Sequence, residues 1–170
     1  MLRFLSILAS LVWLACANAL AQPHQDVQLL VQDGAIVTGR VDFNTPGNPI
    51  TPGVRVFTGF FGEAPNGTDD PGYNASGGTT GSPSPFAPNT LIAFDIVDAL
   101  RKWNGADFSI LPPERIAIIL GFNPVIVTPD TPDTLVPGFN FVSANSTGGF
   151  HQHINYFLDP PASNGVYLLT

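Results

Sequence analysis

The sequence predicts an all-β protein, a two-sheet antiparallel sandwich or jelly roll with one short helix. Gly and Pro contribute 17 residues each, and turn formers at this density interrupt helices and separate strands. The stretches between them are rich in Val, Ile, Phe and Thr, which suit a pleated, half-buried backbone. About eight such short stretches, separated by turn signals, are typical of a sandwich.

The N-terminus has the layout of a secretory signal peptide. Residues 1–21 contain one early positive charge, Arg3, then an apolar run and an exit of small residues. We expect cleavage near Ala21, which leaves residues 22–170 as a single β-sandwich domain. The mature protein is then secreted, periplasmic or at the cell surface. The apolar run is shorter than the roughly 20 residues that a bilayer span needs, so we expect no transmembrane segment in the mature chain.

Two other processing routes stay open, cleavage after Ala19 and lipoprotein processing at Cys16. Cleavage at Ala21 removes Cys16, the sole cysteine, and therefore excludes disulfides and thiol catalysis. It also removes Arg3, which lowers the net charge from −7 to −8. That charge argues against a nucleic-acid partner and against docking on anionic lipid, because both need a basic face.

The first half of the mature chain predicts a hairpin, a strand and a long loop. Residues 26–43 hold two β runs around Asp33-Gly34, a strong hairpin signal. After a loop, residues 54–62 predict a third strand. Residues 63–89 have almost no periodic apolar pattern, and loops of this length are usually functional or disordered.

The second half predicts one helix among strands. Residues 90–97 resemble a buried strand, and residues 97–103 one or two helical turns with Asp98 as N-cap, stopped by Asn104-Gly105. We expect the ring of Trp103 to be buried rather than to stack on a sugar. Four more strands are predicted at residues 114–122, 139–145, 150–158 and 166–170.

The strand at residues 150–158 carries two histidines, His151 and His153. Side chains alternate between the two faces of a strand, so the two imidazoles share a polar face and Ile154 and Tyr156 lie on the apolar one. Imidazoles at this spacing can converge on one ion, and zinc or copper suits neutral imidazole nitrogen. The competing interpretation is a solvated strand face, and a short motif alone does not separate the two.

A zinc site needs three or four protein ligands, and this strand supplies two. The third would come from elsewhere in the chain. The candidates are His24, Glu63, Asp95, Asp98 and Asp159.

An acidic stretch within the long loop predicts a second, weaker metal candidate. Glu63, Asp69 and Asp70 lie close together with Asn66 and Asn74. Calcium prefers six to eight oxygen ligands in a flexible loop, although the spacing matches no EF-hand. The alternative is a solvated turn, where Asp and Asn are favoured for backbone reasons.

Three segments, "DALRKWNGADF", "GGFHQHINYFL" and "NGVYLLT", resemble those of uncharacterised exported bacterial β-rich proteins that often carry a C-terminal PEP-CTERM sorting tag. The resemblance runs from about Val37 to Thr170 and implies a secreted β-rich fold. No sorting tag is present, and the sequence stops inside a predicted strand. We therefore expect that the C-terminus is truncated, or that the strand lies at an edge.

Three functions are consistent with these features. The chain has no G-x-S-x-G, H-E-x-x-H, P-loop or G-x-G-x-x-G motif, which favours a non-enzymatic cell-envelope or matrix protein with a surface or matrix partner. The second is an exported zinc or copper binder that uses His151 and His153. The third is a small hydrolase whose catalytic site is assembled only by the fold.

Overall fold

The computed structural model describes residues 25–76, 86–160 and 162–170 and shows an all-β sandwich. The described residues contain no helix, so none that could cross a membrane. The predicted signal peptide and its cleavage sites lie outside the described residues. The strands are β1 Gln25–Gln32, β2 Ala35–Asp42, β3 Ile50–Pro52, β4 Gly67–Thr68, β5 Tyr73–Ala75, β6 Leu91–Ile96, β7 Arg101–Lys102, β8 Ile116–Ile119, β9 Ile126–Val127, β10 Val136–Ser143, β11 Phe150–Gln152, β12 Asn155–Leu158 and β13 Tyr167–Leu168.

The predicted hairpin is confirmed. Strands β1 and β2 pair antiparallel from Gln25↔Asp42 to Gln32↔Ala35. Asp33 and Gly34 connect them with φ of 52° and 77°. Positive φ at both central residues defines the type I′ turn, whose twist matches that of the flanking strands.

The hairpin belongs to a five-stranded sheet with the order β11-β5-β1-β2-β3. Strand β5 runs parallel to β1, and the other neighbours are antiparallel. The edge strand β3 lies where the sequence predicts a loop. It approaches β2 closely, since a Cβ on Gly39 would lie 2.9 Å from the Thr51 carbonyl oxygen.

The strand predicted at residues 54–62 is wrong, because this segment has no strand pairing. It runs instead against the backbone around Asp70, where a Cβ on Gly59 would lie 2.2 Å from the Asp70 carbonyl oxygen. Its apolar residues remain partly in solvent, with Val56 80% and Phe60 55% exposed. The apolar residues of this segment therefore do not form the buried face of a sheet.

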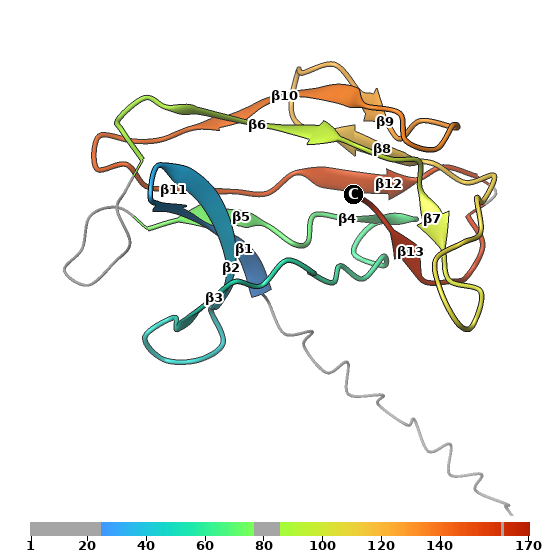
Figure 1. The fold of residues 1–170 in the computed structure, drawn as a ribbon, viewed down its shortest axis with the longest axis horizontal. Coiled ribbons are helices and arrows are strands. Elements are labelled where there is room, and N and C mark those ends of the chain that lie inside the picture. The colour runs from blue at the N-terminus through green and yellow to red at the C-terminus, as the bar shows by residue number, and fades with distance from the viewer. Residues whose placement is uncertain (1–24, 77–85, 161) are drawn as a thin grey trace, which may run out of the picture.

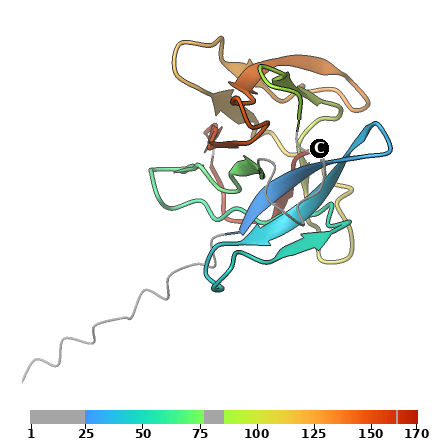
Figure 2. The same ribbon diagram turned by 90° about the vertical axis from the view of Figure 1, so that its left-hand side faces the viewer.

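The other strands form a four-stranded sheet, β4-β12-β8-β9, and two pairs, β10-β6 and β13-β7. Figure 1 shows β6 and β10 along one side and β1, β2 and β3 along the other, with β12 between them. Figure 2, turned by 90°, shows the same separation of the β10-β6 pair from the hairpin. The core fills this space with buried Ile96, Leu100, Ile118, Phe141 and Ile154.

The predicted helix is wrong. Asp98 Oδ1 accepts hydrogen bonds from the backbone N–H groups of Ala99 and Asp133, 2.8 Å each, and Asp98 forms an ion pair with Arg101 at 2.8 Å. Asp98 therefore braces a corner against a distant loop instead of capping a helix. The predicted burial of Trp103 is also wrong, since the residue is 41% exposed, with its ring centroid 5.1 Å from that of Phe108.

Two further expectations need correction. The long loop predicted at residues 63–89 contains the short strands β4 and β5, and residues 77–85 lie outside the described residues. The strand predicted at residues 150–158 is two strands of different sheets, β11 and β12, separated at His153 and Ile154. The chain changes sheets there because Ile154, only 1% exposed, enters the core while β12 pairs with β8.

Candidate metal centre

The first histidine is placed by three adjacent strands of the five-stranded sheet. In register, His151 on β11 faces Asn74 on β5, and Asn74 faces Gln28 on β1. The Asn74 side-chain amide donates a 2.5 Å hydrogen bond to Gln28 Oε1. Asp26 lies two residues before Gln28, and strand alternation places both on the same face. This polar row directs His151 towards Asp26, with His151 Nδ1 3.6 Å from Asp26 Oδ2.

Asp26 is the most secluded member of the group. Its exposed fraction is 0%, whereas 47% of the His151 side chain is exposed. The ring of Phe43 contacts the His151 ring edge-on at a centroid distance of 5.5 Å. The centre therefore has a buried carboxylate at its base and an imidazole at its rim.

The second histidine comes from the break between β11 and β12. His153 Nδ1 lies 2.9 Å from the Asp69 carbonyl oxygen. A carbonyl only accepts, so Nδ1 carries the proton and the neutral ring has its lone pair on Nε2. That Nε2 lies 3.1 Å from His151 Nε2. A backbone carbonyl that fixes the tautomer and orientation of an imidazole is the usual support of a metal-binding histidine.

Gly72 leaves open the space that these donors face. A Cβ on Gly72 would lie 2.7 Å from His153 Nε2 and 2.9 Å from Asp26 Oδ2. The Gly72 carbonyl accepts a 2.9 Å hydrogen bond from the Val27 N–H, which holds this backbone against β1. A side chain at this position would therefore displace one of the two donors.

The donor set fits zinc or copper. Asp26, His151 and His153 each offer one ligand atom, and these atoms lie within 4.8 Å of one another. Two nitrogens that bind one tetrahedral zinc ion at 2.0–2.1 Å are about 3.3 Å apart. The 3.1 Å separation of the two Nε2 atoms is close to that value.

A second group, Asp69, Asp70 and His153, lies on the other side of the His153 ring. The Asp69 Oδ2 and Asp70 Oδ1 atoms are each 3.8 Å from His153 Nδ1. These two carboxylates therefore lie near the ring nitrogen that donates to the Asp69 carbonyl, and Nε2 is left to face the first group. The structure thus brings two of the three predicted calcium ligands to the histidine pair.

Glu63, the third predicted calcium ligand, belongs to neither group in the described residues. It accepts hydrogen bonds from the Asp69 N–H at 3.0 Å and the Thr68 hydroxyl at 2.8 Å. These bonds, that from Asp69 first, lower the pKa of Glu63. Glu63 therefore braces the turn that carries Asp69 and Asp70.

The sequence-based search for a third ligand missed Asp26. Among the predicted candidates, Asp95 accepts a hydrogen bond from the Gly138 N–H and Asp98 forms an ion pair with Arg101. These two residues and Asp159 belong to neither of the ligand groups found in the described residues. His24 lies outside the described residues. One signal was present, because Asp26 opens the mostly apolar run "DVQLLV", and Asp is depleted in strands.

Comparison with protein-family models, with curated proteins and with solved structures found no match for this chain.

Proposed function

We propose that this protein is an exported β-sandwich of the cell envelope or matrix that binds zinc or copper through Asp26, His151 and His153. One observation carries the proposal. His153 donates from Nδ1 to the Asp69 carbonyl and directs Nε2 at His151 Nε2, 3.1 Å away, beside the buried carboxylate of Asp26.

The chemistry of the donors favours a transition metal over calcium or magnesium. Two imidazole nitrogens and one carboxylate suit zinc or copper, whereas calcium and magnesium prefer oxygen ligands. The carboxylate is that of Asp26, which is 0% exposed and has its Oδ2 3.6 Å from His151 Nδ1. Asp26 comes from β1 of the hairpin, His151 from β11, and His153 from the break between β11 and β12.

The rim of the centre leaves room for an outside ligand. Three protein ligands are one short of tetrahedral coordination, and His151 is half exposed. Water, or a donor from a surface or matrix partner, would complete the shell. The acidic chain, with a net charge of −7, also attracts cations.

The test is calorimetric titration of zinc, copper and calcium into protein purified without a histidine tag. We expect one zinc or copper ion per chain and no calcium binding at this centre. The double variant His151→Ala/His153→Ala should lose this binding, and Asp26→Asn should weaken it at least tenfold. Asp159→Ala, at an exposed carboxylate outside both described ligand groups, is the matched control and should bind as the wild type does. Equal heats from the wild type and the double variant would reject the centre.

A further inference from the structure

A second cluster of reactive groups surrounds Ser163, from parts of the chain that the histidine centre does not use. The Lys102 ammonium donates to Ser163 Oγ at 2.6 Å, and Ser163 Oγ donates to Glu114 Oε1 at 2.5 Å. The Tyr167 hydroxyl donates to the Ser163 carbonyl at 2.8 Å and lies 3.1 Å from its Oγ. Lys102 and Tyr167 are register partners on β7 and β13.

The carboxylate of this cluster is buried and the serine is not. Glu114 is only 2% exposed, and its Oε1 also accepts the Ser163 N–H at 3.2 Å. Its Oε2 is buried with no hydrogen-bond partner among the described residues. Ser163 itself is exposed. The single hydroxyl proton of Ser163 therefore points at a buried carboxylate, although Ser163 as a residue is exposed.

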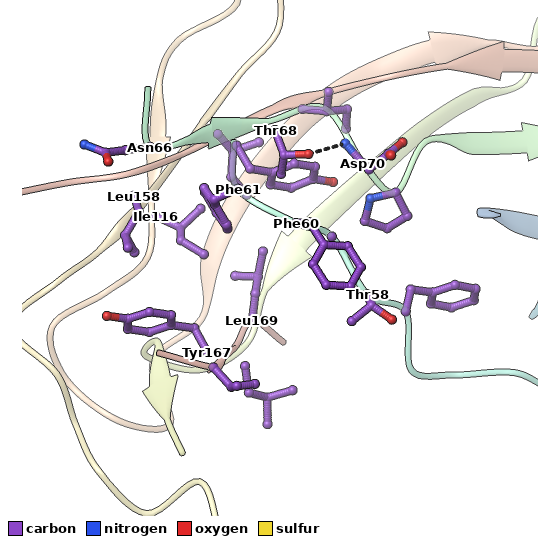
Figure 3. A pocket seen from close by; sticks show the side chains of 18 of the residues that line it. Thr58, Phe60, Phe61, Asn66, Thr68, Asp70, Ile116, Leu158, Tyr167 and Leu169 are labelled. Carbon is purple, nitrogen blue, oxygen red and sulfur yellow. Dashed lines mark hydrogen bonds between the residues drawn. The ribbon is translucent and has the colours of Figure 1, made fainter. Parts of the chain in front are cut away.

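Ser163 opens onto a large apolar cleft. The cleft has a volume of about 1420 Å³ and lies between the segment 55–66, strands β8 and β12, and the C-terminal residues. Figure 3 shows Phe60, Phe61, Ile116 and Tyr167 around the opening. Binding clefts for small organic ligands have mostly apolar walls with a few polar groups at defined points. Ser163 and Tyr167 are two of the polar residues that line this cleft.

We propose that Ser163 is a nucleophile that hydrolyses carboxylic esters whose apolar acyl group occupies this cleft. Glu114 is the general base, and Lys102 stabilises the negative charge that develops on oxygen. Tyr167 is a positioning residue, since its hydroxyl holds the Ser163 backbone. Nucleophile and base within hydrogen-bond reach, with a third group that orients or stabilises them, is the arrangement of covalent catalysis in serine hydrolases.

The reaction balances with water as the only co-reactant. Ser163 Oγ forms a bond to the ester carbonyl carbon as its proton passes to Glu114, and the Lys102 ammonium faces the resulting oxyanion. The carbon–alkoxy bond then breaks, and the alcohol leaves with the proton from Glu114. Water attacks the acyl-serine, loses its proton to Glu114, and the carboxylic acid departs as the proton returns to Oγ.

The competing role for the same contacts is a structural clasp. Lys102, Glu114 and Ser163 join the β7-β13 pair to the segment before β8 by hydrogen bonds alone. A clasp needs no reactivity at Ser163, so covalent labelling separates the two roles.

The experiment treats the purified chain with a fluorophosphonate probe and locates the adduct by peptide mass spectrometry. We expect one adduct, on Ser163, and its loss in Ser163→Ala. The matched control is Ser143→Ala, an exposed serine on β10, which should label as the wild type does. Both serines are exposed, and circular dichroism checks that both variants fold, since Ser163→Ala also removes a hydrogen bond to buried Glu114.

Hydrolysis of p-nitrophenyl esters gives the second readout, measured with EDTA present so that it does not depend on the histidine centre. We expect rates to rise from the acetate to the octanoate ester, and Ser163→Ala and Glu114→Gln to lower kcat at least 100-fold. Absence of an adduct, or equal rates for Ser163→Ala and Ser143→Ala, would overturn the assignment. The contacts around Ser163 would then have a structural role alone.

Discussion

The hydroxyl groups of Tyr73 and Tyr156 lie 2.9 Å apart and join β5 of the five-stranded sheet to β12 of the four-stranded sheet. Burial raises the pKa of both hydroxyls, that of Tyr156 strongly, with the Tyr73 hydroxyl adding to the effect. This bond is a polar contact between the two sheets, at the edge of a core that includes Ile118, Phe141 and Ile154.

Removal of either hydroxyl should destabilise the protein because the other loses its partner in the interior. We expect Tyr73→Phe and Tyr156→Phe each to lower the free energy of unfolding by about 1–3 kcal/mol. The double variant should lose less than the sum, since no orphaned hydroxyl remains. Urea denaturation of the four proteins measures this coupling, and strictly additive losses would show that the two hydroxyls act independently.

The substitution Gly72→Ala tests the shape of the metal centre without removing a ligand. Its methyl group would enter the space beside His153 Nε2 and Asp26 Oδ2, so we expect zinc affinity to fall at least tenfold. Displacement of these neighbours should also cost about 1–3 kcal/mol of stability.

The matched control is Gly47→Ala. Gly47 has a φ of 87° with no atom within 4 Å of the added Cβ, so this change strains the backbone far from the centre. We expect a stability loss of about 1 kcal/mol with unchanged zinc affinity. Unchanged zinc affinity in Gly72→Ala would place the ion elsewhere.

The Asp98 corner predicts a pH dependence. Hydrogen bonds from Arg101, then from the Asp133 N–H, lower the pKa of Asp98 from 3.8 to about 2. A lowered folded-state pKa means that Asp98 stabilises the fold above about pH 4 and loses this effect as the pH falls towards about 2. Asp98→Asn should therefore be less stable than the wild type at neutral pH, and the difference should shrink across that acid window.

Thermal unfolding at a series of pH values measures the Asp98 effect. Asp159→Asn, which changes an exposed carboxylate after β12, is the control and should follow the wild type. Parallel curves for Asp98→Asn and the wild type over the whole acid range would contradict the prediction.

Much of the fold could be predicted because its signals are local. The Asp33-Gly34 turn demands positive φ at two successive positions, which identifies the first hairpin from the sequence alone. The strands β6 and β8 lie within their predicted ranges, and β10 overlaps the strand predicted at residues 139–145 but begins earlier, at Val136. The helix at residues 97–103 failed because its signal was also local, while Asp98 is held by Asp133, 35 residues away.

The candidate metal centre was also predicted only in part. The prediction that the two rings lie together assumed one strand through His151 and His153. Their Nε2 atoms are 3.1 Å apart, but β11 ends at Gln152 and His153 lies in the break before β12. The sequence could not supply Asp26 as the neighbour, because the parallel pairing of β1 with β5 joins residues more than 40 positions apart.

By itself, then, the sequence determined the all-β class and the first hairpin, because period-two alternation and turn chemistry act between near neighbours. Only the tertiary structure decided that Asp26 lies beside the histidines, that β11 and β12 belong to different sheets, and that Glu114 and Lys102 meet at Ser163. Those contacts depend on which strands pair across long separations, and many pairings satisfy the same local pattern of apolar and polar residues.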